Sequence, residues 1–204
     1  MNSKVIGIML ILGPILTMGI WILYSINTDD LSPSDAIIAV LAEKNKAEIG
    51  SILQIFGAIF MFTGLYYLAK SLKGENSISN HFSEMGGLFL LLCLPLWVVM
   101  MGAWLPAIEA AELYGNDVGA SIIASSTLFQ MSGVLMSVGF FMLGTSLTIL
   151  KKYKGIVGIL LIIASVAAFL DMLFNIEILA ILGWMGMFLM TFILGILMTL
   201  NKSN

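Results

Sequence analysis

Three polar residues, Asp171, Asn175 and Glu177, interrupt two long apolar runs near the C-terminus. Glu177 suits a helix N-terminus and Asn175 suits a helix C-terminus, so helix ends alone explain both residues. Asp171 is different, because it stands about one turn before a helix end, where the helix dipole disfavours its charge. An acid inside an apolar helix indicates ligand binding, proton transfer or ion pairing. Asp171 is therefore the first candidate for chemistry, with Asn175 beside it.

The sequence offers Asp171 few partners of opposite charge. All nine cationic residues of the chain are lysines. Only Lys44 and Lys46 are expected on the same side of a membrane as Asp171. We therefore predict a structural ion pair between Asp171 and Lys44 or Lys46, which would hold the segment near residue 44 over the helices.

Mildly polar residues also recur along one expected helix. Ser126, Gln130, Gly133 and Ser137 are spaced by four, three and four residues and would share a helix face. Stripes of this kind commonly serve close helix packing in membranes. In the alternative interpretation, Gln130 and Ser137 join Asp171 and Asn175 along a ligand or transport path.

Other chemistry finds little support in the composition. The chain has one histidine, His81, and one cysteine, Cys93, which excludes a haem held by paired histidines and an internal disulfide. The acids Glu109, Glu112 and Asp117 are interpreted as a solvated rim. The net charge of −3 and the lack of a basic run exclude a nucleic-acid partner. We predict no catalytic residue, no metal site and no cofactor.

The elements that position these residues are membrane helices. Hydrophobic residues make up 60% of the 204 residues and charged residues only 10%. A membrane span needs about 20 mostly apolar residues. Six runs satisfy this requirement, at about residues 5–26, 49–68, 85–105, 121–150, 155–174 and 178–200. The predicted fold is an all-α, polytopic membrane bundle in a single domain covering residues 1–204.

The lysines predict how the bundle is oriented. With six spans both termini lie on one side, together with seven of the nine lysines. These are Lys4, Lys70, Lys73, Lys151, Lys152, Lys154 and Lys202. Lysine-rich short loops remain in the cytoplasm. We therefore predict a multi-pass protein of the plasma membrane with both termini cytoplasmic.

A short external helix is expected between the first two spans. Ser32-Pro-Ser-Asp35 has the pattern of a helix start, with a capping serine, a proline at the first position and an acid three residues on. Ala36, Ile37, Val40 and Leu41 then form an apolar stripe. The pattern predicts an amphipathic helix on or near the outer membrane surface.

The glycine pattern of the later helices resembles a known group. Phe129-Gln-Met-Ser-Gly133 runs on to Leu143-Gly144, a short basic link follows, and Gly155-Ile-Val-Gly-Ile-Leu-Leu-Ile-Ile-Ala164 begins the next helix. With the external segment, this layout resembles an uncharacterised family of six-helix integral membrane proteins from bacteria and archaea. The resemblance covers most of the chain. That family has no assigned activity, so it implies no catalytic residues.

Three functions remain open from the sequence. The sparse polar chemistry favours a non-enzymatic accessory protein, or a binder of a lipid or small apolar ligand, in contact with the bilayer and with partner subunits or copies of itself. The alternative is a small oligomeric transporter or channel. The third is an intramembrane enzyme that uses carboxylates, which requires two acids at one pocket.

Overall fold

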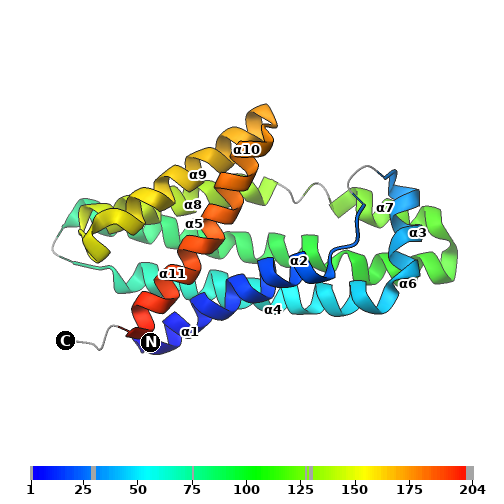
Figure 1. The fold of residues 1–204 in the computed structure, drawn as a ribbon, viewed down its shortest axis with the longest axis horizontal. Helices are drawn as coiled ribbons and strands as arrows, with labels where there is room; N and C mark the ends of the chain where they lie inside the picture. The colour runs from blue at the N-terminus through cyan, green and yellow to red at the C-terminus, as the bar shows by residue number, and fades with distance from the viewer. Residues whose placement is uncertain (1, 29–30, 75, 127, 129–130, 201–204) are drawn as a thin grey trace.

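The computed structural model describes residues 2–28, 31–74, 76–126, 128 and 131–200, and within them it is helical without strands. The segments are α1 (Ser3–Pro14), η1 (Ile15–Gly19), α2 (Ile20–Tyr24), α3 (Pro33–Ala42), α4 (Lys44–Ser71), α5 (Ser77–Gly102), α6 (Trp104–Tyr114), α7 (Asn116–Ser126), α8 (Ser132–Ile149), η3 (Lys152–Gly155), α9 (Ile156–Phe174), α10 (Glu177–Ala180), η4 (Ile181–Met185) and α11 (Gly186–Leu200). Six stretches of the described chain are long and apolar enough to cross a membrane. The predicted all-α bundle with six membrane-length helices is confirmed (Figure 1).

The long helices form a closed ring. Around it run α1, α4, α5, α8, α9 and α11, each packed on the next, and α11 packs back on α1. Apolar side chains such as Phe62, Phe140 and Leu143 are fully buried and fill the ring. Glycine brings α8 and α9 together, because a Cβ on Gly144 would lie 2.7 Å from the carbonyl oxygen of Gly158. Small residues therefore set the helix separation here, as the sequence indicates.

One end of the ring holds the start of α1 and the end of α11 (Figure 1). There the Ser3 hydroxyl donates to the carbonyl oxygen of Met198 at 3.4 Å. The links from α4 to α5 and from α8 to α9 lie at the same end. We call it the terminal end. The start of α1 and the end of α11 thus lie at the same end of the ring, as six spans require.

Beyond the opposite end, α3, α6 and α7 form a separate small layer that we call the cap (Figure 1). α6 follows α5 almost directly, and Gly115, at φ +100°, turns the chain back into α7. Ile37, Ala107 and Ala111 form the cap's own buried cluster. α4 has 28 residues, or roughly 42 Å at about 1.5 Å each, against about 30 Å of bilayer hydrocarbon. α4 is therefore longer than the hydrocarbon layer of such a membrane is thick.

A short helix, α3, is present at the segment where the external helix was predicted, and its predicted capping residues are in place. The Ser32 hydroxyl accepts from the backbone N–H of Asp35 at 3.2 Å and donates to the Asp35 carboxylate at 2.6 Å. Ala36, Ile37 and Val40 are buried, and α3 packs mainly against α7 and α6. The apolar stripe thus has a protein partner, and its place relative to the membrane surface stays a prediction.

The fourth predicted span, 121–150, is wrong in its extent. α7 ends at Ser126 and α8 begins at Ser132, so Ser126 and Ser137 do not lie on one continuous helix. α7 belongs to the cap, where it packs against α3 and α6. The hydroxyls of Ser125 and Ser126 each donate to a carbonyl three residues back at 2.7 Å. Such bonds compete with the helical ladder and favour an end at this point.

Candidate functional site

Three adjoining cavities lie among the ring helices near the cap. The cap-side cavity, of about 460 Å³, lies among the end of α2, the loop after it, α3, α4 and the α5–α6 junction. The central cavity, of about 270 Å³, shares Trp21, Gln54 and Met101 with it. The α8 cavity, of about 330 Å³, shares Trp97 and Trp184 with the central one. All four tryptophans of the chain line this set, which we call the tryptophan cavities.

Irregular helix segments shape the central cavity. Thr17 and Met18 reach it from η1, a π-helical turn after Pro14, and Trp184 reaches it from η4, a second π-helical turn. Trp97 follows Pro95 within α5. Proline removes a backbone donor and widens a helix, and π-turns often mark functional sites. Three departures from regular helix therefore meet at one hollow.

Two polar groups that line the cavities lack partners. Trp97 Nε1 and Ser132 Oγ are buried and have no hydrogen bond to any described residue. The Trp97 ring is held by Phe62, edge-on at 5.9 Å between centroids, and by Phe188 at 6.3 Å. A buried polar group without a partner costs about 1–3 kcal/mol. Both side chains line the α8 cavity.

Asp171 fixes the other deep tryptophan. Its Oδ2 accepts a hydrogen bond from Trp184 Nε1 at 3.2 Å, which joins α9 to η4. On the facing helix, a Cβ on Gly133 would come within 2.8 Å of the Trp184 ring. The indole is thus held at one edge by Asp171 and given room at the other by glycine. Asp171 is a positioning residue for a cavity wall.

The cap-side cavity has a different chemistry. Its described lining carries hydroxyls and amides, from Ser25, Asn27, Thr28, Ser51 and Gln54, between aromatic side chains. None of the described lining residues is charged. Among the described residues, none hydrogen-bonds to the side-chain amide of Gln54, which lies where the cap-side and central cavities meet. The set therefore passes from a polar chamber into two apolar ones.

The residues predicted from sequence are not gathered at one point. Asn175 ends α9 in a left-handed conformation, and its N–H bonds the carbonyl of Asp171 at 2.7 Å. Ser137 is buried on α8 with its hydroxyl unpaired, yet it lines none of the three cavities. Gln130 lies outside the described residues. The predicted shared path is thus not assembled from the residues that can be placed.

The predicted ion pair of Asp171 is wrong. Lys44 Nζ binds Glu112 at 2.7 Å and approaches Glu48 at 3.9 Å. Lys46 binds Glu43 at 3.0 Å. Lys44 pairs with Glu48 on α4 and with Glu112 on α6, and Lys46 pairs with Glu43 just before α4. The Lys44–Glu112 pair joins α4 to the cap. Asp171 faces an indole N–H instead.

No protein-family model, curated protein or solved structure matches this chain. The resemblance to the six-helix family therefore stays a prediction.

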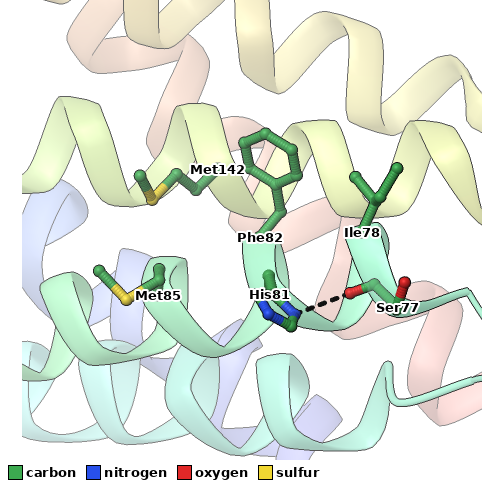
Figure 2. Close-up of a pocket in the computed structure, with 6 residues that line it drawn as sticks. All are labelled: Ser77, Ile78, His81, Phe82, Met85 and Met142. Carbon is green, nitrogen blue, oxygen red and sulfur yellow. Dashed lines mark hydrogen bonds between the residues drawn. The ribbon is translucent and has the colours of Figure 1, made fainter.

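A fourth hollow, near the terminal end, contrasts with the tryptophan cavities. It is a groove of about 290 Å³ between α5 and α8. Figure 2 shows side chains that line it, among them Phe82 from α5 and Met142 from α8. Ile78 and Met85 on its wall are 61% and 44% exposed. His81 Nδ1 is paired with the carbonyl oxygen of Ser77 at 2.9 Å. The groove is apolar, open and without the orphaned donors of the central region.

Sequence reasoning missed Gln54, Trp97, Ser132 and Trp184 as site residues. One signal was available, because Trp97 lies far from either expected membrane boundary, where tryptophans concentrate. Ser132 and Gln54 gave no such signal, since single polar residues in apolar helices are often satisfied by packing.

Proposed function

We propose that this protein is a multi-pass plasma-membrane protein that binds a lipid-like small molecule in the tryptophan cavities without transforming it. One observation carries the proposal: a set of adjoining hollows between the ring helices near the cap is lined by all four tryptophans, two buried polar groups of its lining residues being unpaired. Ligand sites are concave, mostly apolar and supplied with a few polar groups that fix orientation. The cavities have this composition.

The packing elsewhere supports binding over transport. Between the central cavity and the terminal end, Leu65, Leu68 and Leu147 are fully buried and fill the ring. A permeation path needs a continuous polar route. No carboxylate is among the described lining of the three cavities, which argues against acid catalysis there.

The lysines support the orientation. Lys4, Lys70, Lys73, Lys151 and Lys152 belong to segments at the terminal end. Because lysine-rich short loops remain in the cytoplasm, we propose that the terminal end faces the cytoplasm and that the cap lies outside. A ligand would then enter from the outer half of the bilayer.

The experiment uses the full chain in nanodiscs and an equimolar mixture of a fatty alcohol, a fatty acid and a monoacylglycerol of equal chain length. Native mass spectrometry reads which amphiphile stays bound. Met101→Trp fills the junction of the cap-side and central cavities, and Ala47→Phe narrows the cap-side cavity from α4. Met85→Trp, on the same helix as Met101 but at the open groove, is the matched control.

We expect the wild-type protein and Met85→Trp to retain an amphiphile, and each blocking variant to lose at least about tenfold in affinity, since a filled pocket removes the apolar contact that drives binding. Far-ultraviolet circular dichroism checks that the variants are folded. The proposal fails if wild type retains nothing, or if both folded blocking variants retain as much as the control.

A further inference from the structure

We infer that the ligand is an uncharged amphiphile with a hydrogen-bonding head in the cap-side cavity and an acceptor oxygen within its apolar body that meets Trp97 and Ser132. This inference rests on the proposed binding function and adds the chemical class of the ligand. It comes from the polar groups along the three cavities, taken from the cap inward.

The cap-side cavity favours a neutral head. Its described lining offers hydroxyl and amide groups from Asn27, Thr28, Ser51 and Gln54 and no charge. Burying an unpaired charge is costly, whereas hydroxyls and amides bond a neutral polar head well.

The charged groups of this end are used elsewhere. Lys44, Glu48, Glu109 and Glu112 line a separate surface hollow between α4 and the α5–α6 segment. There Lys44 Nζ donates to both carboxylate oxygens of Glu112 at 2.7 Å. These groups lie outside the cavities, and the lysine among them is paired with Glu112, so they provide no site for a phosphate or a quaternary amine in the cap-side cavity.

Two side chains that line the α8 cavity carry unpaired polar groups, Trp97 Nε1 and Ser132 Oγ. An indole N–H can only donate, so Trp97 Nε1 needs an oxygen acceptor, and Ser132 Oγ can donate to the same kind of group. Trp184 does not compete for it, because its Nε1 is already used by Asp171. Thr17 does not compete either, since its hydroxyl donates to the carbonyl of Gly13 at 2.9 Å. A carbonyl, ether or hydroxyl oxygen in the ligand body fits the two unpaired groups.

The head group is tested with three esters of one fatty acid: a monoacylglycerol, a lysophosphatidic acid and an acylcholine. Their acyl chains and ester linkage are the same, and their heads are neutral, anionic and cationic in turn. Native mass spectrometry of wild-type protein in nanodiscs should show the neutral ester bound at least about tenfold more tightly than either charged one. Equal or tighter binding of a charged ester overturns this inference while leaving the proposed function intact. If none of the three is retained, the proposed function fails as well.

The body acceptor is tested with monoacylglycerols that carry a ketone at successive chain positions. At one position we expect about fivefold tighter binding than to the plain chain, as one hydrogen bond provides. Ser132→Ala and Trp97→Phe should each reduce that advantage, measured against binding of the plain chain to the same variant. Ser146→Ala, on the same helix but outside the cavities, should leave the advantage unchanged. The inference is overturned if no ketone position binds more tightly, or if the advantage survives both cavity variants.

Discussion

The two ends of α8 differ in the hydrogen bonding of their buried serines. Near the terminal end, Ser146 is fully buried and its hydroxyl lies 2.9 Å from that of Ser79 on α5. At the other end, Ser132 is equally buried, and its hydroxyl has no partner among the described residues. Gly144 and Gly133 show the same contrast. A Cβ added at Gly144 would meet the backbone of α9, whereas a Cβ added at Gly133 would meet side chains at a cavity.

Under the proposed function, this difference divides α8 into a structural half near the terminal end and a binding half near the cap. Folding stability favours filled space and paired polar groups. The terminal half of α8 satisfies both conditions, whereas the half near the cap violates both at the tryptophan cavities. Real proteins depart from these rules mainly at functional sites. The proposed ligand would fill space in this hollow half.

The largest expected effect comes from adding one methyl group at each glycine of α8. In Gly144→Ala the new Cβ meets the carbonyl oxygen of Gly158, so α8 and α9 must separate, which should cost about 1–3 kcal/mol of unfolding free energy. In Gly133→Ala the new Cβ meets the side chains of Met172 and Trp184 and no backbone atom, so stability should stay within about 1 kcal/mol of wild type. Reversible unfolding in detergent mixtures of rising SDS content measures both. Equal losses would erase the distinction between the two halves.

A smaller effect is expected when each buried serine of α8 loses its hydroxyl. Ser146→Ala leaves the Ser79 hydroxyl without its side-chain partner and should lower the unfolding free energy by about 1 kcal/mol. Ser132→Ala removes an unpaired group and should leave the ligand-free protein unchanged or slightly more stable. The same unfolding assay on delipidated protein compares the pair. A clear loss in Ser132→Ala would mean that its hydroxyl is already satisfied.

The smallest effect concerns the wall of the binding half. Asp171→Asn keeps one acceptor oxygen for Trp184 Nε1 but replaces the other oxygen by a donor amide, which weakens the bond. We expect a stability loss below about 1 kcal/mol. Fluorine NMR of protein labelled with 5-fluorotryptophan should show the Trp184 signal shifting while that of Trp104, in the cap, stays in place. An unmoved Trp184 signal would show that Asp171 does not position this ring.

Much of the fold could be predicted from local pattern. The apolar runs indicated the six long helices, and Ser32 with Asp35 marked the start of α3 correctly. The split of the fourth run could not be predicted, because Ser125 and Ser126 lie in an otherwise apolar sequence, and the packing of α7 on α3 and α6 decides it. The partner of Asp171 was missed because charge alone favoured lysine. An indole N–H thirteen residues along the chain becomes its neighbour only when η4 folds back on α9.

The sequence by itself determined that this chain forms six apolar helices with polar, capped connections, because hydrophobic runs and helix-start residues act locally and each helix satisfies its own backbone. Only the tertiary structure decided which helices close the ring, that α3, α6 and α7 form a cap, and that four tryptophans far apart in the chain line one set of cavities. Those outcomes depend on how side chains of different helices fit against one another, and no single segment contains that information.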